Sequence, residues 1–442
     1  MNRYSDSPDI MAIGDSLYHG VHSLSFAPWM AAHSTPALVA RAIGMRMVVP
    51  DPAHPLLWDL TEEIRHDSVP GLARRMPDIV RASLVHWRPD QPWSVHEAFD
   101  NIAIGGADIA DLWTATDASQ WQTFLDLSDY FQRDNDALIE PLTKLTPLWF
   151  ALATCHTLNP HHRVEQRDRS ALQQVQDRAP RILLINIGSN EGLFDACFMG
   201  EISVATEAER QAMRDTAETI NARVRELAER LRDLPDRVER IVFNGLIMPR
   251  AVPNLMPDSL HEGQFPGDAY YQTYGPRLTN TQQTVTGDAL RRYDEVIAEV
   301  NATSRETLGT IVGNRAVFAD LYPVAQAMDG KHHRGRGLRI PGTDVTMDNR
   351  PVTATFGGFV GGFGSLDNMH PSLPGYAVLA DVVLDALGRT DIRTDKTAAF
   401  HADRLLSDFP GLAVTSFQMQ IAFIASFARL FRGQRQGGLF GA

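Results

Sequence analysis

The sequence predicts an α/β fold with a central parallel sheet, and two observations carry this prediction. Short runs of β-type apolar residues recur along the chain and alternate with segments of helical periodicity, which is the pattern of βαβ units. The run Ile182–Ile187 is apolar at nearly every position, as expected for a strand that helices cover on both faces. A chain of 442 residues is long enough for one large domain with insertions or for two domains.

Six apolar segments are predicted as strands, and none of them alternates between apolar and polar residues in the way that a half-exposed strand does. They are Ile10–Ile13, Met45–Val49, Asn101–Ile104, Ile182–Ile187, Arg240–Leu246 and Ala316–Leu321.

Two helical regions separate these strands. Residues 107–179 read as a long helical insertion that is rich in aromatic residues, which form either a lid or acyl pocket or the core of the inserted helices: Trp113, Trp121, Phe124, Tyr130, Phe131, Trp149 and Phe150. Residues 207–234 predict a second helix whose apolar positions, from Met213 to Leu234, repeat at intervals of three, four and seven. We expect that face to pack on the sheet and the charged face to be solvated.

Two further regions depart from this alternation. From about residue 247 to 285 the pattern dissolves into prolines, glycines and tyrosines, which predicts a long loop of the kind that often serves function. We assign residues 1–390 to one domain and residues 391–442 to a helical C-terminal extension. Within the extension, Val414–Phe431 is marginal for a membrane span. Docking on the domain is favoured for it, with a subunit interface or contact with a lipid surface as alternatives.

The bulk composition limits the classes of partner and compartment. A formal net charge of −13 argues against nucleic acid or an anionic membrane as the general partner. Two cysteines, Cys155 and Cys197, exclude a disulfide framework and fit no zinc spacing, so we expect buried thiols. The first residues lack the apolar core of a secretory signal, which makes the cytoplasm the default expectation, with secretion or the periplasm left open.

The first motif with chemical content is Gly14-Asp15-Ser16-Leu17, directly after the first predicted strand. Gly14 permits a tight bend, and Ser16 then lies at the carboxyl end of a strand, where open α/β sheets bind ligands. Ser16 also opens a helix, whose N-terminus favours negative charge nearby. The arrangement suits a nucleophile, provided that a base, an orienting acid and oxyanion donors occur elsewhere in the chain.

The candidate base and acid are His370 and Asp367. Asp-x-x-His alone is a weak signal, because the chain contains it four times: Asp51/His54, Asp258/His261, Asp329/His332 and Asp367/His370. The last pair alone follows a glycine-rich loop, residues 357–364, and leads into an apolar helix. We therefore expect the histidines of the other three pairs to lie in surface loops.

Two more strand ends offer donors for an oxyanion. Asn190 follows the strongest predicted strand, in Gly188-Ser189-Asn190-Glu191, and its amide can donate to a developing negative charge. Gly105-Gly106 follows the run Asn101–Ile104, and a glycine backbone N–H there is unobstructed by a side chain. Both are also compatible with ordinary turns.

Together these four blocks resemble the GDSL or SGNH hydrolase family, in their order and in their placement at strand ends, over about residues 10–388. The resemblance implies a flavodoxin-like three-layer α/β/α fold. It also implies Ser16 as nucleophile, His370 as base, Asp367 as the acid that orients it, and an oxyanion hole made by Ser16, Gly106 and Asn190, with Gly105 as the alternative glycine. Glu191 departs from the family, which usually has aspartate there, and this puts the bracing of the loop in question.

The resemblance implies a serine hydrolase of carboxylic esters, an esterase or lipase, that works through an acyl-enzyme without metal or cofactor on a small-molecule or lipid ester. An acyltransferase that uses the same acyl-enzyme and a catalytically silent binding protein are the alternatives. The other histidines are weaker candidates. His19 and His22 follow Ser16 closely and could line the substrate site, while the pairs His161-His162 and His332-His333 lack a third metal ligand at suitable spacing.

Overall fold

The structure is a computed structural model that describes residues 7–66, 69–133, 140–192, 204–257, 269–272, 284–333, 335–355 and 358–407. Its centre is a sheet of four parallel strands in the order β1-β2-β3-β7. The strands are β1 (Ile10–Gly14), β2 (Ile182–Asn186), β3 (Arg240–Asn244) and β7 (Ala316–Ala319). Because all four run in the same direction, their carboxyl ends meet at one edge of the sheet.

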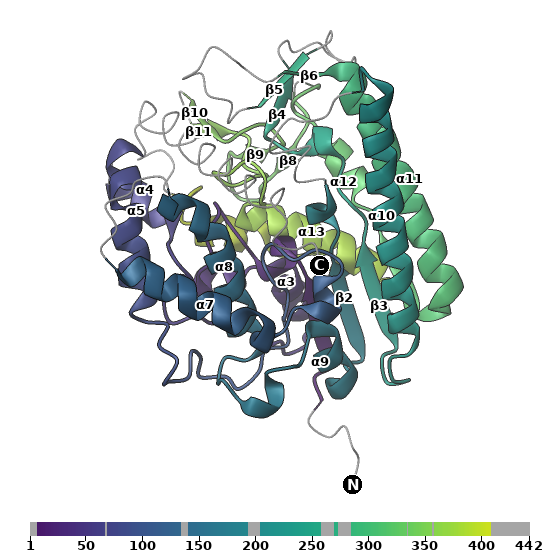
Figure 1. Ribbon diagram of the computed structural model, residues 1–442. Coiled ribbons are helices and arrows are strands. Elements are labelled where there is room, and N and C mark those ends of the chain that lie inside the picture. The colour runs from purple at the N-terminus through teal and green to yellow at the C-terminus, as the bar shows by residue number, and fades with distance from the viewer. Residues whose placement is uncertain are drawn as a thin grey trace.

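Helices pack on both faces of the sheet (Figure 1). Successive residues of β1 belong to two different buried clusters. Ile10 and Ala12 of β1 pack in one buried cluster with apolar residues of α3 (Thr35–Ala42) and α13 (Leu373–Ala386). Met11 and Ile13 pack in the other cluster with α9 (Ala171–Arg178), α10 (Glu207–Arg232) and α11 (Gly287–Ile311). The predicted three-layer α/β/α fold with a central parallel sheet is confirmed.

The prediction of a strand at Met45–Val49 is wrong. The segment follows α3 without forming a strand. Its Val48 carbonyl accepts from the amides of Asp100 and Asn101, while the Val48 amide donates to the Asp100 carboxylate at 2.7 Å. Pro50 and Pro52 come next and have no N–H to donate. The apolar run therefore lies beside the sheet without joining its ladder.

The predicted strand Asn101–Ile104 is reduced to a single bridge. Asn101 pairs with Ala12 in parallel, and the amides of Ile102 and Ile104 donate to Ala12 and Gly14. The segment thus runs alongside β1 and ends next to Ser16, which is the position that the sequence pattern required of it. It is too irregular to count as a fifth strand.

The insertion of residues 107–179 is helical, as predicted, in several pieces: α6 (Asp111–Thr114), α7 (Asp117–Gln132), α8 (Glu140–Leu158), the 3-10 turn η1 (Val164–Gln166) and α9. Its aromatic residues belong to the core. Phe124, Phe131 and Phe150 are buried in the same cluster as one face of the sheet, with Trp113, Trp121 and Tyr130 packed against it. This favours the core interpretation of these residues over a lid.

The region from about 247 to 285 is less irregular than predicted. Within its described residues it contains η4 (Pro249–Ala251) and a small antiparallel sheet of β4 (Leu255–Pro257), β5 (Ala269–Gln272) and β6 (Thr284–Thr286). The sequence pattern missed these strands because they are only three or four residues long. Two further hairpins pair β8 (Leu338–Arg339) with β9 (Thr346–Met347) and β10 (Thr353–Thr355) with β11 (Gly358–Val360). All three small sheets lie together at the top of Figure 1.

The remaining elements are short, apart from α5: α1 (Ser16–His19), α2 (Pro28–Ala31), α4 (Leu60–His66), α5 (Val69–Leu84), η2 (Ser189–Glu191), η5 (Gly313–Arg315), α12 (Tyr322–Ala327) and α14 (Lys396–Ala402). Between α13 and residue 407 the chain is packed on the domain, since Ala399, Leu405 and Leu406 are buried. The predicted helix Val414–Phe431 and Cys197 lie outside the described residues. No helix in the described ranges combines the length and apolar character needed to cross a membrane.

Candidate active site

Ser16 is placed by the tight turn at the end of β1. Gly14 has a φ of 149°, and a Cβ on it would lie 2.1 Å from the carbonyl oxygen of Asn186, so only glycine fits. Asp15 caps α1 by accepting from the Leu17 amide at 3.0 Å. Ser16 is then the first residue of α1, half-buried at the carboxyl edge of the sheet, as the sequence predicted.

Asp15 continues into a buried chain of polar side chains along this edge. Asn186 at the end of β2 donates to the Asp15 carboxylate at 2.9 Å, and Asn244 at the end of β3 donates to Asn186 at 3.1 Å. Tyr18 of α1 closes the chain by donating to Asn244 at 3.1 Å. Burial raises the pKa of Asp15 to about 6, although the Leu17 amide and Asn186 oppose the shift. This series of hydrogen-bonded side chains fixes α1 to the ends of β1, β2 and β3.

His370 lies between Ser16 and Asp367, which are more than 350 residues apart in sequence. Its Nε2 is 2.9 Å from the Ser16 hydroxyl oxygen, and its Nδ1 is 2.7 Å from a carboxylate oxygen of Asp367. Burial opposes a charge on Asp367, but His370 and the amides of Met369 and His370 hold its pKa below the ordinary value. The ionised carboxylate is only an acceptor, so Nδ1 carries the proton and Nε2 presents its lone pair to Ser16.

Asp367 is fully buried and held by several donors besides His370 Nδ1. One carboxylate oxygen accepts from the amides of Met369 and His370 at 2.9 and 2.8 Å, and the Ser365 hydroxyl donates to it at 3.2 Å. The other accepts from the amide of Leu24 at 2.8 Å. Sequence reasoning missed Leu24 and Ser365. A backbone donor more than 340 residues away leaves no trace in side-chain type.

The loops proposed for the oxyanion hole meet at the same edge of the sheet. The Asn190 amide donates to the Ala107 carbonyl at 2.7 Å, which joins the loop after β2 to the loop after Ile104. Gly106 has a φ of 89°, a conformation that favours glycine, and is half-buried. The Gly105 amide donates to Nδ1 of His19 at 3.2 Å. Ser16, Gly106 and Asn190 are thus carried by three neighbouring segments of the sheet edge.

Glu191, the departure from the family pattern, braces this junction. Its carboxylate accepts from the Ile109 amide at 3.0 Å and pairs with Arg223 of α10 at 2.9 Å. Arg223 also pairs with Asp108 at 3.2 Å. Burial, together with Asp108, raises the pKa of Glu191 despite these donors. The longer side chain therefore ties the Gly106 loop and the Asn190 loop to the same helix.

His19 and His22 do not line the pocket beside Ser16. His19 is buried against Phe26, and burial lowers its pKa to about 3 with a smaller contribution from His156, so it is a neutral acceptor for Gly105. His22 is buried next to Asp403, with Nε2 3.3 Å from a carboxylate oxygen. Both histidines therefore act within the scaffold around Ser16.

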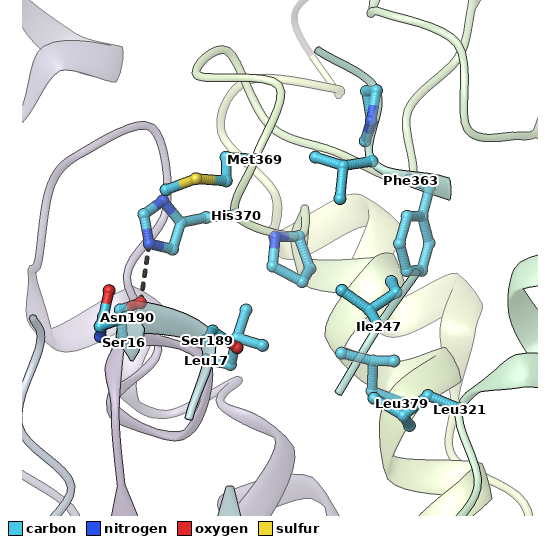
Figure 2. Close-up of a pocket in the computed structure, with 13 residues that line it drawn as sticks. Ser16, Leu17, Ser189, Asn190, Ile247, Leu321, Phe363, Met369, His370 and Leu379 are labelled. Carbon is cyan, nitrogen blue, oxygen red and sulfur yellow. Dashed lines mark hydrogen bonds between the residues drawn. The ribbon is translucent and has the colours of Figure 1, made fainter. Parts of the chain in front are cut away.

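A pocket opens beside Ser16 and His370, with about 650 Å³ of space when its solvent-filled mouth is included. In Figure 2, Ser16, Asn190 and His370 lie at one end and the apolar Ile247, Leu321, Phe363 and Leu379 at the other. These apolar residues follow β3, β7 and β11 or belong to α13. The site can therefore bring an apolar group against a serine whose hydroxyl faces a histidine.

The other histidines that the sequence offered as metal ligands include His332 and His333. The prediction of a surface-loop histidine is wrong for His332, because its side chain is buried and its Nδ1 lies 2.7 Å from a carboxylate oxygen of Asp329. Within the described parts of the chain, no three His, Cys, Asp or Glu side chains are grouped so that they could hold a metal ion.

The chain matches the model of a known family. The family model of the GDSL-like lipases and acylhydrolases matches residues 10–383, which include all five candidate site residues. No curated protein and no solved structure shows significant similarity to the chain.

Proposed function

Because the chain belongs to the GDSL-like lipase/acylhydrolase family, we propose that it is a serine hydrolase of carboxylic esters that works through an acyl-enzyme. The observation that carries the proposal is the pair of hydrogen bonds at His370, 2.9 Å to Ser16 and 2.7 Å to Asp367. A serine is a weak nucleophile unless a neighbouring base can take its proton, and this arrangement supplies such a base.

In the acylation step, Ser16 Oγ attacks the ester carbonyl carbon while His370 Nε2 accepts its proton. The negative charge that develops on the carbonyl oxygen is stabilised by the Ser16 and Gly106 amides and the side-chain amide of Asn190. Asp367 keeps the imidazole in the required tautomer and stabilises its charged form. The bond to the alcohol oxygen then breaks, and His370 returns its proton to the departing alcohol.

In the deacylation step, water takes the place of the alcohol. His370 accepts a proton from it as its oxygen attacks the acyl carbonyl, and the same donors stabilise the second oxyanion. The bond to Ser16 breaks, Ser16 regains a proton from His370, and a carboxylic acid leaves.

The apolar end of the pocket supports an apolar acyl group as the part of the substrate bound beside Ser16. Leu321, Phe363 and Leu379 offer no charged group to a substrate, and Ile247 and Val252 continue the same lining. Burying each methylene of an acyl chain there contributes roughly 0.8 kcal/mol. We therefore propose small-molecule or lipid esters with extended acyl chains over acetate esters.

The test is fluorophosphonate labelling of wild type and Ser16→Ala, run beside hydrolysis of p-nitrophenyl acetate, butyrate and octanoate. We expect labelling of wild type alone and the highest kcat/KM for a longer ester. Products formed in the presence of added alcohols separate hydrolysis from acyl transfer. A folded wild type that neither labels nor turns over any ester would contradict the proposal and favour a binding protein.

A further inference from the structure

The turn His22–Ser25, which follows α1, has an unfavourable backbone. His22 and Ser25 exchange backbone hydrogen bonds at 3.0 and 2.9 Å, so Ser23 and Leu24 form a two-residue turn. Both have positive φ values, 54° and 52°. Such turns strongly favour asparagine and glycine, and a serine followed by a leucine is strained there. Strain of this kind persists only where the surroundings enforce it.

The strained turn points its amides at the loop that contains the proposed catalytic acid. The Leu24 amide donates to Asp367 at 2.8 Å, and the Ser23 amide donates to the Ser365 hydroxyl at 2.8 Å. Ser365 in turn donates to Asp367 at 3.2 Å. The Ser23 hydroxyl accepts from the Leu366 amide at 3.2 Å. The position of the Asp367 carboxylate thus depends on this turn.

A second pair of a histidine and a carboxylate, His22 and Asp403, supports the turn. His22 Nδ1 is 3.0 Å from the Ser23 hydroxyl, and its Nε2 is 3.3 Å from Asp403, with both side chains fully buried. Asp403 also accepts from the Leu373 amide at 2.9 Å and from the amides of Leu405 and Leu406 at 3.0 Å. The Asp403 carboxylate therefore joins α13, the segment that follows α14 and the turn.

We propose that Asp403, His22 and Ser23 form a positioning relay that orients Asp367 through the Ser23–Leu24 turn. The inference rests on the proposed function, in which Asp367 orients His370. It extends that function to Asp403, which lies beyond the residues 10–383 matched by the family. None of the three relay residues is proposed to contact substrate, and their effect is exerted through Asp367.

The charge on His22 gives the relay a measurable signature. Burial opposes this charge, but Asp403, Asp367 and Asp59 together raise the pKa of His22. Without Asp403 the buried imidazole becomes neutral, and Asp367 loses a neighbouring positive charge and a firmly held amide donor. The Asp367 carboxylate then stabilises the protonated form of His370 more strongly. The neutral imidazole that accepts the Ser16 proton is therefore formed only at higher pH.

The test is Asp403→Asn, which keeps the side-chain size and removes the charge. We expect kcat for p-nitrophenyl butyrate to fall about 10- to 100-fold, as misplacement of a catalytic group does, with KM little changed. The acid limb of the pH profile of kcat/KM should move to higher pH. Ser23→Ala, which leaves the Asp403–His22 pair intact, should shift both quantities in the same directions by less.

Lys396→Met is the matched control, because Lys396 of α14 forms an ion pair with Asp381 of α13 and so anchors the same C-terminal segment without touching the turn. We expect its kcat and pH profile to stay near those of wild type. If Asp403→Asn behaves like Lys396→Met, or if its acid limb does not move, the relay is only a structural anchor and the inference is overturned.

A readout that needs no turnover separates this inference from the proposed function. The proton that His370 Nδ1 shares with Asp367 should give a strongly deshielded NMR resonance, assigned by its absence in His370→Ala. We expect Asp403→Asn to shift or broaden it and Lys396→Met to leave it in place. An inactive wild type that shows these responses would contradict the ester hydrolase alone, whereas an unresponsive or missing wild-type resonance would contradict the relay.

Discussion

Two Asp-x-x-His pairs of this chain have the same local geometry and different surroundings. In Asp367/His370 and in Asp329/His332, the histidine Nδ1 lies 2.7 Å from the carboxylate. Asp367 is fully buried, whereas the Asp329 side chain is 21% exposed. Nε2 of His370 faces Ser16, at one end of an apolar pocket. In both pairs the histidine meets its carboxylate, and His370 also faces the Ser16 hydroxyl.

The surroundings of Asp329 differ from those of Asp367. Asp329 lines a separate cavity of about 500 Å³, whose described lining residues include Arg250, Tyr322 and His333 and no serine, threonine or cysteine. Asp329 accepts from His332 and weakly from Asn349 at 3.5 Å. The comparison teaches that the Asp-x-x-His pair alone does not define the proposed site, which also requires Ser16 at the end of β1.

The largest expected effect is the loss of the proposed nucleophile or base. Ser16→Ala and His370→Ala should each lower kcat by about 10⁴-fold or more, and the double variant should be scarcely worse, because the two act as a unit. His332→Ala should stay within a few-fold of wild type. Steady-state kinetics on p-nitrophenyl butyrate measures all four, and clearly additive losses would contradict the shared role.

A smaller loss is expected from the carboxylates. Asp367→Asn disturbs the tautomer of His370 and should lower kcat by up to about 10⁴-fold, less than removal of His370 itself. Asp329→Asn, the same change in the other pair, should leave kcat nearly unchanged. Equal losses in the two variants would show that the pairs are not distinguished by their surroundings.

The removal of one proposed oxyanion donor is expected to have the next largest effect. Asn190→Ala should lower kcat by about 10²- to 10³-fold and change KM less, because the donor acts mainly on the transition state. Arg223→Met, which removes a partner of Glu191 behind the same loop, should have a milder effect. A rise in KM with unchanged kcat in Asn190→Ala would instead place the amide in ground-state binding.

The smallest effect concerns stability and pH. The pKa of Asp15 is raised to about 6 in the folded protein, so the folded state binds a proton more tightly than the unfolded state. Its contribution to stability is therefore favourable at low pH, declines as pH rises from about 4 to about 6 and is then constant. Asp15→Asn should remove this decline, measured by urea unfolding at pH 4 to 8. An unchanged slope would contradict the assignment.

The sequence was sufficient for the features that local pattern encodes. The sequence pattern predicted three features: the apolar runs at β1, β2 and β3, the glycine turn before Ser16 and the context of Asp367/His370. The strand prediction for Met45–Val49 failed because apolar content does not reveal that the Val48 amide donates to the Asp100 side chain and not to a neighbouring strand. Leu24 could not be found from the sequence, since it acts through its backbone amide on Asp367, more than 340 residues away. Asp403 could not be found either, since only the fold brings its carboxylate to His22.

The most direct measurement is intact-protein mass spectrometry of the enzyme quenched during turnover of a p-nitrophenyl ester, followed by peptide mapping. The proposed function predicts one acyl group per chain, carried by the peptide that contains Ser16, in wild type and in His332→Ala. It predicts none in Ser16→Ala. Turnover by Ser16→Ala, or an acyl group stably attached to another residue during turnover, would contradict Ser16 as the nucleophile.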